Sequence, residues 1–132
     1  MECEIGSDHG QPEIHILDKA KCGLVAGQKM LIPTVADVEL ALRVLPGGTV
    51  TSEREFRAQI AAPFGADGCC TFATNKVLRA IVEGAYAQLL DGVSQEVVLP
   101  FWRVVTAGST IAKRMGLDAS MFRSLLERDI QQ

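Results

Sequence analysis

Residues 97–105 read V-V-L-P-F-W-R-V-V and form the most apolar run of the chain. The run contains the only tryptophan, Trp102, which Phe101 precedes and Arg103 follows. β-Branched and aromatic residues favour a strand, and Pro100 indicates a break or an edge within it. We therefore expect residues 96–105 to form a strand that enters and leaves a core. On composition alone, it would be a buried strand with Arg103 reaching out to solvent.

The composition fits one globular domain with an aliphatic core. The chain has 132 residues, of which 48% are hydrophobic, 22% charged and only 5% aromatic. This length is enough for a single core. The formal net charge of −3 argues against a protein that coats nucleic acid non-specifically, because such proteins are normally basic. A local basic face remains compatible with this charge.

The cysteine pattern does not indicate a metal or cofactor site. No C-x-x-C pair occurs among Cys3, Cys22, Cys69 and Cys70, and neither histidine has ligand spacing with them. We therefore expect no zinc, no other metal and no cofactor. The adjacent Cys69 and Cys70 either form a vicinal disulfide or stay as two reduced, partly buried thiols, and we expect the reduced pair.

The N-terminal residues lack the features of a targeting segment. Residues 1–12 are polar and contain glycines, which indicates a flexible tail, and residues 13–132 form the expected single domain. The first residues are acidic and have no apolar h-region, so no signal peptide is predicted. No apolar run is long enough to span a membrane. A cytoplasmic protein without membrane contact is the resulting expectation.

Two helices in the first half of the chain have clear start signals. Thr34 is a good N-cap with Asp37 three residues later, and apolar residues recur at helical spacing up to the P-G-G sequence at 46–48. Ser52 and Glu55 form a capping-box pattern, which predicts a second helix to about residue 62. Residues 49–51 between these helices can form only a minimal strand.

A third, longer helix is predicted from about residue 74 to about residue 90. Its inward side carries the apolar residues Val77, Leu78, Ile81, Val82, Ala85 and Leu89. A last helix follows Asp118, which is a good N-cap. The order of helix, minimal strand, helix, longer helix and β segment is that of a helix-turn-helix with a following wing. The predicted class is mainly α with short β, built on a winged-helix core in a single domain.

The chemistry of the side chains favours binding over catalysis. Cys69 and Cys70 precede a helix, which can lower the pKa of a thiol. A catalytic cysteine normally needs a base, and the only histidines, His9 and His15, lie before the predicted helices. Inert structural thiols are therefore the preferred interpretation.

Five cations are candidates for a binding face: Lys76, Arg79, Arg103, Lys113 and Arg114. They either form such a face or are dispersed solvated charges. Arg103 stands out because it follows two large rings in an apolar run. An arginine there either pairs with an acid inside the fold or points into a cleft that accepts a phosphate or a base edge.

Residues 100–105, P-F-W-R-V-V, resemble the active-site stretch Pro-Cys-His-Arg-Val-Val of the O6-alkylguanine-DNA alkyltransferases. The flanking sequences M-L-I-P-T at 30–34, L-P-G-G at 45–48 and G-A-D at 65–67 are similar to those of bacterial alkyltransferase-like proteins, which carry aromatic-Trp-Arg in place of the catalytic triplet. The resemblance covers most of residues 12–129. It implies a winged-helix DNA-binding core.

The resemblance also implies which activities are lost. Phe101 stands where the family has its alkyl-accepting cysteine, and Trp102 stands where it has the activating histidine. An aromatic ring cannot accept an alkyl group by in-line displacement, so alkyl transfer is excluded on this alignment. The arginine that fills the gap left by an extruded base corresponds to about Asn75. The tyrosine that turns the phosphate backbone corresponds to about Ser52 or Glu53.

Two hypotheses follow. The first is a non-enzymatic, alkyltransferase-like protein that binds double-stranded DNA, including alkylated or extruded bases. Its expected contacts are the DNA and base-pocket residues Ser52, Asn75, Lys76, Arg79, Phe101, Trp102 and Arg103, and the phosphate contacts Lys113 and Arg114. The second is a protein-interaction or regulatory module on the same scaffold that no longer binds DNA. It would be favoured if nearby acids neutralise Lys76 and Arg79 and an apolar patch is exposed instead.

Overall fold

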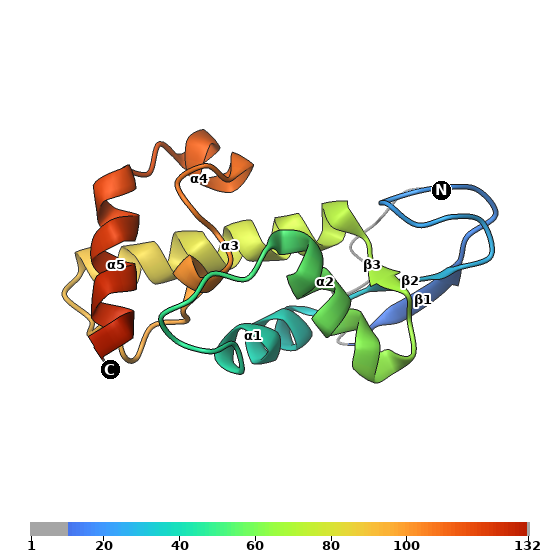
Figure 1. Cartoon of the computed structure of the whole chain (residues 1–132), viewed down its shortest axis with the longest axis horizontal. Coiled ribbons are helices and arrows are strands. Elements are labelled where there is room, and N and C mark those ends of the chain that lie inside the picture. Colours follow the sequence, from blue (N-terminus) through green and yellow to red (C-terminus); the bar gives the residue numbers. More distant parts are fainter. Residues whose placement is uncertain (1–10, 132) are drawn as a thin grey trace.

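Helix α3 (Thr71–Leu90) is the axis of the fold, and the other elements are arranged around it (Figure 1). The computed structural model describes residues 11–131, so most of the expected tail of residues 1–12 lies outside it. The remaining helices are α1 (Val35–Arg43), α2 (Glu53–Ala61), α4 (Thr110–Met115) and α5 (Ala119–Gln131), with the short 3-10 helices η2 (Ala62–Phe64) and η3 (Phe101–Arg103).

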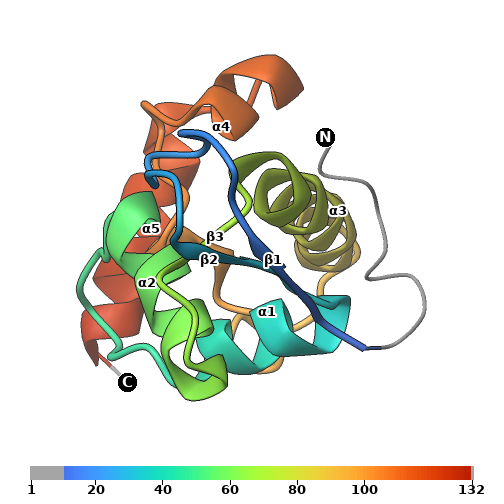
Figure 2. The same cartoon turned by 90° about the vertical axis from the view of Figure 1, so that its right-hand side faces the viewer.

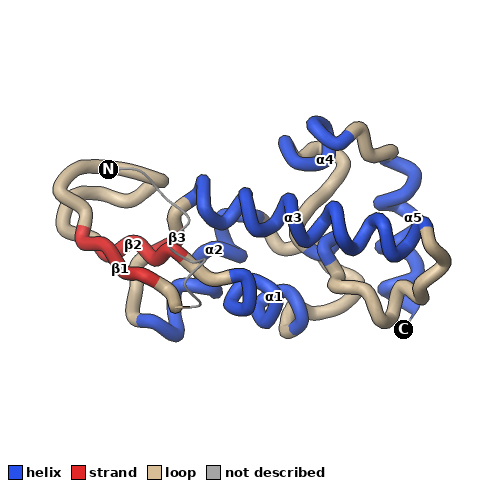
Figure 3. The backbone as a smooth tube through the Cα atoms, turned by 180° about the vertical axis from the view of Figure 1, so that it is seen from behind, coloured by secondary structure: helices blue, strands red, loops and turns tan. Residues whose placement is uncertain are grey.

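A small sheet lies at the N-terminal end of α3 (Figures 1 and 3). It consists of β1 (Glu13–Ile16), β2 (Lys29–Ile32) and β3 (Gly68–Cys69), in that order. β1 pairs with β2 in antiparallel fashion, and β2 pairs with β3 in parallel fashion. Figure 2, viewed from the sheet end, shows α3 nearly end-on beside the strands. The predicted class, mainly α with short β, is confirmed, whereas the winged-helix arrangement is not.

The capping signals in the sequence are formed in the structure. The Thr34 hydroxyl accepts a hydrogen bond from the Asp37 amide, and the Asp37 carboxylate accepts one from the Thr34 amide. Ser52 caps α2 by accepting a hydrogen bond from the Glu55 amide. Each cap satisfies amides that the first turn of a helix leaves without intrahelical partners. The expected starts of α1 and α2 are therefore confirmed.

The main core packs α3 against α1, α2, η3 and α5. The side of α3 that the sequence predicted to face inward is buried at Val77, Leu78, Ile81, Val82 and Ala85. A second, smaller cluster joins the sheet to the start of α3. Its buried members are Leu17, Met30, Ile32, Cys70 and Ala73.

The prediction of a strand over residues 96–105 is wrong. The segment is an irregular loop that ends in η3, and Pro100 precedes that turn. Local hydrogen bonds replace a ladder: the amides of Val104 and Val105 both donate to the Phe101 carbonyl. β-Propensity describes a residue that fits a pleated, half-buried surface. Here Val98, Phe101, Trp102, Val104 and Val105 are instead buried in the main core.

Two further expectations also need correction. Residues 49–51 form no strand, although the Thr51 amide donates to the Arg103 carbonyl at 2.7 Å. Helix α3 begins at Thr71 rather than near residue 74, because the Cys70 sulfur caps it by accepting from the Ala73 amide. No strand follows α3 within the described residues, so the segment expected to form a wing has a different structure.

Candidate functional site

The two rings of the F-W-R motif are sealed in the core. Phe101 is 0% exposed and Trp102 is 1% exposed. The Phe101 ring packs edge-on against Trp102 at 5.3 Å and against Phe122 of α5 at 6.1 Å between ring centroids. Aromatic pairs favour this arrangement. In this conformation neither ring is open to stacking on a base, so the motif stabilises the junction between η3 and α5.

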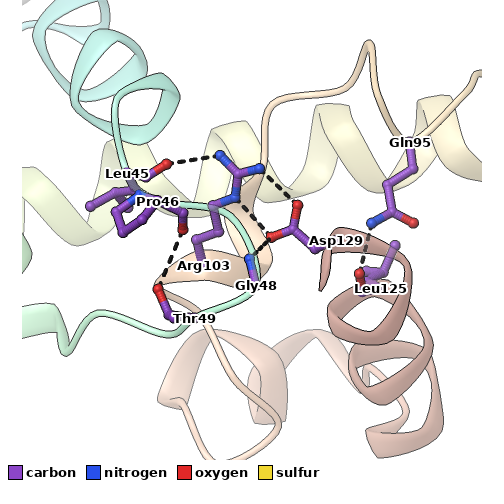
Figure 4. Close-up of polar contacts among 8 residues, drawn as sticks. All are labelled: Leu45, Pro46, Gly48, Thr49, Gln95, Arg103, Leu125 and Asp129. Atoms are coloured by element: carbon purple, nitrogen blue, oxygen red, sulfur yellow. Dashed lines mark hydrogen bonds and ion pairs between the residues drawn. The ribbon is translucent and has the colours of Figure 1, made fainter. Parts of the chain in front are cut away.

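Arg103 pairs with an acid inside the fold, which was one of its two predicted roles (Figure 4). Its Nη2 and Nε donate to Oδ1 and Oδ2 of Asp129 at 2.7 and 2.9 Å. Its Nη1 donates to the Leu45 carbonyl at 3.0 Å, and the Gly48 amide donates to Asp129 Oδ2 at 2.8 Å. The pair therefore ties η3 and α5 to the loop that follows α1.

The electrostatics of this pair favour an ionised carboxylate. The Asp129 side chain is fully buried and that of Arg103 is 17% exposed. The hydrogen bonds from Arg103 lower the pKa of Asp129, and the amide of Gly48 adds to this effect. Bidentate arginine–carboxylate contacts are among the stronger hydrogen-bonded pairs. Gly47 permits the approach, since a Cβ there would lie 3.1 Å from Arg103 Nη2.

A small polar hollow of about 170 Å³ lies next to this pair, lined by Arg43, Gln95, Trp102 and Arg103 among others. The Trp102 indole N–H and the Gln95 side-chain oxygen have no hydrogen-bond partner among the described residues. The indole still helps to lower the pKa of Asp129, although it lies outside hydrogen-bond geometry. Gln95 also donates to the Leu125 carbonyl at 2.7 Å, which fixes the loop after α3 to α5. The hollow suits a bridging water.

A second hollow brings predicted binding residues together. It has a volume of about 390 Å³ and is lined by residues of α4 and of the N-terminal half of α3. Helix α4 lies above α3 in Figures 1 and 3. We call it the α3–α4 groove. Its lining residues are Phe72, Asn75, Lys76, Arg79, Thr110, Ile111 and Arg114.

Positive charge prevails in the α3–α4 groove. Lys76, Arg79 and Arg114 are exposed, and no ion pair involves Lys76 or Arg114 within residues 11–131. Arg79 contacts Glu83 at 3.4 Å, and both side chains are about half exposed. Exposed pairs of this kind are weak and leave the guanidinium able to contact another anion. The groove therefore offers three cations from two helices to a single ligand.

The other predicted contacts lie elsewhere. Lys113 is exposed on α4 but does not line the groove, and Ser52 serves as the cap of α2. Three lining residues were not predicted as contacts from the sequence: Phe72, Thr110 and Ile111. A helix that starts near residue 74, as the sequence predicts, leaves Phe72 outside it. With α3 starting at Thr71, the i, i+3 spacing of Phe72 and Asn75 would have placed both on one face.

Cys69 and Cys70 differ in state. Cys69 is a free thiol, so it forms no vicinal disulfide. Cys70 is disulfide-bonded, and the expected reduced pair is therefore wrong for Cys70. Burial raises the pKa of the Cys69 thiol to about 12, which makes it a poor nucleophile at neutral pH. Among residues 11–131, no group of three or more His, Cys, Asp and Glu side chains is placed to hold a metal ion.

A wider hollow of about 940 Å³ lies at the other end of α3, between its last turns, the loop that follows and α5. Tyr86, Leu89, Leu90, Val93 and Met121 give it an apolar wall. Leu90 is largely exposed there. This region was not predicted from the sequence.

The α3–α4 groove and the wider hollow are thus two separate candidate surfaces, while the F-W-R motif is internal. No helix in the described part of the chain is both long enough and apolar enough to cross a membrane. Comparisons with protein-family models, with curated proteins and with solved structures find no match for this chain.

Proposed function

We propose that this chain binds double-stranded DNA through the α3–α4 groove without catalysing a reaction on it. The observation that carries this proposal is the convergence of Lys76, Arg79 and Arg114 on one hollow beside the N-terminal half of α3. Cations that contact phosphates release condensed counterions, which supplies much of the affinity in DNA binding. The net charge of −3 opposes binding by the molecule as a whole, so the attraction must come from a local group of cations such as this one.

The proposal includes a winged-helix core of alkyltransferase-like type, with α3 as the recognition helix. The order α1, α2, α3 and the resemblance around residues 100–105 support it. Phe101 and Trp102 replace the residues that would accept an alkyl group, so the protein would bind alkylated DNA and leave it unchanged. Because both rings are buried, we assign contact with DNA to the groove rather than to the F-W-R motif.

Fluorescence anisotropy with a labelled short duplex, with and without one O6-alkylguanine, tests the proposal. We expect binding at low salt that weakens as salt rises. Replacing Lys76, Arg79 and Arg114 together by glutamine should reduce the slope of log Kd against log salt by roughly three, since each phosphate contact contributes about 0.9. Arg128→Gln on α5 is the matched control, because Arg128 is also exposed but lies at the other hollow.

Two results would overturn this proposal. One is the absence of binding to either duplex at low salt. The other is an affinity of the triple variant equal to that of the wild type and of Arg128→Gln. A difference between the two duplexes would add recognition of the alkylated base, whereas equal affinities would limit the function to binding undamaged DNA.

The second candidate function is a protein-interaction module, and the exposed Leu90 beside the 940 Å³ hollow favours it. Exposed apolar surface in a groove marks protein contacts. Sedimentation of the wild type and of Leu90→Glu tests the case in which the partner is a second copy. A concentration-dependent dimer that Leu90→Glu dissociates supports this function, and a monomer at all concentrations argues against self-association.

A further inference from the structure

Phe72 indicates that a ligand of the α3–α4 groove makes an apolar contact in addition to its contacts with the cations. It lies in the first turn of α3, is 69% exposed and lines the α3–α4 groove together with three cations. A single exposed aromatic residue is common on protein surfaces. An exposed ring that shares one groove with Lys76, Arg79 and Arg114 is different, because it offers a flat apolar face to a ligand whose charge is negative.

Asn75 supplies the second, independent observation. It lies three residues after Phe72 on the same face of α3 and lines the same groove. Its side-chain oxygen Oδ1 is buried and has no hydrogen-bond partner among the described residues. An unpaired buried acceptor is costly, so a ligand that donates a hydrogen bond to it is favoured. A half-turn about the terminal side-chain bond is easy and exchanges the oxygen with the amide nitrogen, so the side chain can present either atom to a ligand in the groove that it lines.

These groups restrict the chemistry of the ligand. Phosphate and carboxylate oxygens accept hydrogen bonds from the cations but cannot donate to Asn75 Oδ1. An acidic peptide matches the charges, yet its carboxylates have no planar ring for Phe72. A nucleotide supplies all three partners: a phosphate, an exocyclic amine that donates, and a base plane.

We propose that Phe72 stacks on an unstacked nucleobase while Asn75 accepts a hydrogen bond from the exocyclic amine of that base. Lys76, Arg79 and Arg114 hold the neighbouring phosphates. This inference rests on the proposed DNA binding and adds a mode of base contact to it. The base comes either from a single strand or from a duplex step that opens, and both sources present the same flat face.

The first test follows 2-aminopurine fluorescence, which rises or falls with the stacking of this base analogue. The probe is placed in a single strand, in a fully paired duplex and opposite an abasic site. Wild type should change the signal in at least one of these, and Phe72→Tyr should retain the change. Phe72→Leu should abolish it and weaken binding about 5- to 140-fold, the range expected for loss of one base stack. Leu90 lies on the same helix and is as exposed as Phe72, so Leu90→Ala is the control and should alter neither the signal nor the affinity.

The second test compares oligo-dC, whose bases carry an exocyclic amine, with oligo-dT, whose bases do not. Wild type should prefer oligo-dC, and Asn75→Ala should remove the preference while leaving the salt dependence unchanged. Circular dichroism of each variant confirms that it folds.

The outcomes separate this inference from the proposed function. Binding that depends on the three cations but is unchanged by Phe72→Leu and Asn75→Ala would overturn the base contact and leave DNA binding intact. Equal displacement of DNA by a poly-glutamate peptide would also overturn the base contact. Binding that does not depend on the cations would overturn the assignment of the groove itself.

Discussion

Replacing Asp129 by asparagine removes the charge that holds Arg103 inside the fold. The carboxylate accepts two hydrogen bonds from Arg103 and one from the Gly48 amide, and its side chain has no exposed surface. Breaking a buried ion pair by removing one partner costs about 3–5 kcal/mol, because the remaining charge has no counter-charge. Arg103 keeps 17% of its side-chain surface in solvent, so we expect the lower end, about 3 kcal/mol.

Unfolding in urea, followed by the fluorescence of Trp102, measures this loss. Trp102 is the only tryptophan and is buried, so its emission reports loss of the core directly. Small domains have free energies of unfolding of about 5–15 kcal/mol, so Asp129→Asn should still fold. Glu83→Gln serves as control, because its exposed pair with Arg79 should contribute about 0.5 kcal/mol or less.

A double-mutant cycle with Arg103→Met and Asp129→Leu distinguishes a coupled pair from two separate packing effects. We expect the double variant to lose less stability than the sum of the single losses, since apolar residues of similar size often replace a buried pair without a net loss. If Asp129→Asn does not fold, recovery of folding in the double variant supports the same conclusion. The reasoning would be refuted if Asp129→Asn lowered the free energy of unfolding by less than about 1 kcal/mol, or if the losses in the cycle were strictly additive.

Four further outcomes are expected. Gly84→Ala in α3 should raise the free energy of unfolding by about 0.5–1 kcal/mol in urea titrations, because no atom lies within 4 Å of the added Cβ and alanine favours a helix. Gly47→Ala should lower it, because the new Cβ would lie 3.4 Å from Asp129 Oδ1 and crowd the ion pair; an unchanged midpoint would contradict this. Because Arg103 lowers the pKa of Asp129, the stabilisation from this carboxylate is full above its ordinary pKa of about 3.9 and is lost as pH falls through the lower folded value. The difference in stability between wild type and Asp129→Asn should therefore be larger at neutral pH than in acid, and a constant difference would count against the pair. Cys69, whose pKa burial raises to about 12, should react with iodoacetamide at neutral pH only as fast as the protein unfolds, as peptide mass spectrometry can determine.

Features set by neighbours in the sequence could be predicted, and features set by distant contacts could not. The caps at Thr34 and Ser52 depend on side chains only three residues away, so their patterns are visible in the sequence. The sequence predicts a start of α3 that is about three residues too late. The reason is that Cys70 caps the helix, whereas serine, threonine, aspartate and asparagine are the usual capping residues. With the later start, Phe72 precedes the predicted helix, so its place in the α3–α4 groove could not be predicted.

The conformation of residues 96–105 illustrates the limit most clearly. Valines and aromatic rings favour a strand, but a strand needs a neighbouring strand with open hydrogen-bonding groups. Here the segment packs among helices, and η3 satisfies its own amides locally. The partner of Arg103 could not be predicted either, because any of the 16 acidic residues could form an ion pair with it. Asp129 lies 26 positions away on a separate helix.

Burial of the F-W-R motif changes which variants can test DNA binding. A loss of binding in Arg103→Ala would not identify a DNA contact, because the Arg103–Asp129 pair joins three segments and its loss destabilises the fold. Arg114→Gln avoids this ambiguity, since Arg114 is exposed on α4 and has no ion pair in the described residues. We expect Arg114→Gln to weaken DNA binding while keeping the wild-type midpoint in urea. Arg103→Lys should show the opposite pattern, with a lower midpoint and near-normal affinity while folded. If Arg103→Lys instead loses affinity at full stability, the motif contacts DNA directly and the groove is not the principal site.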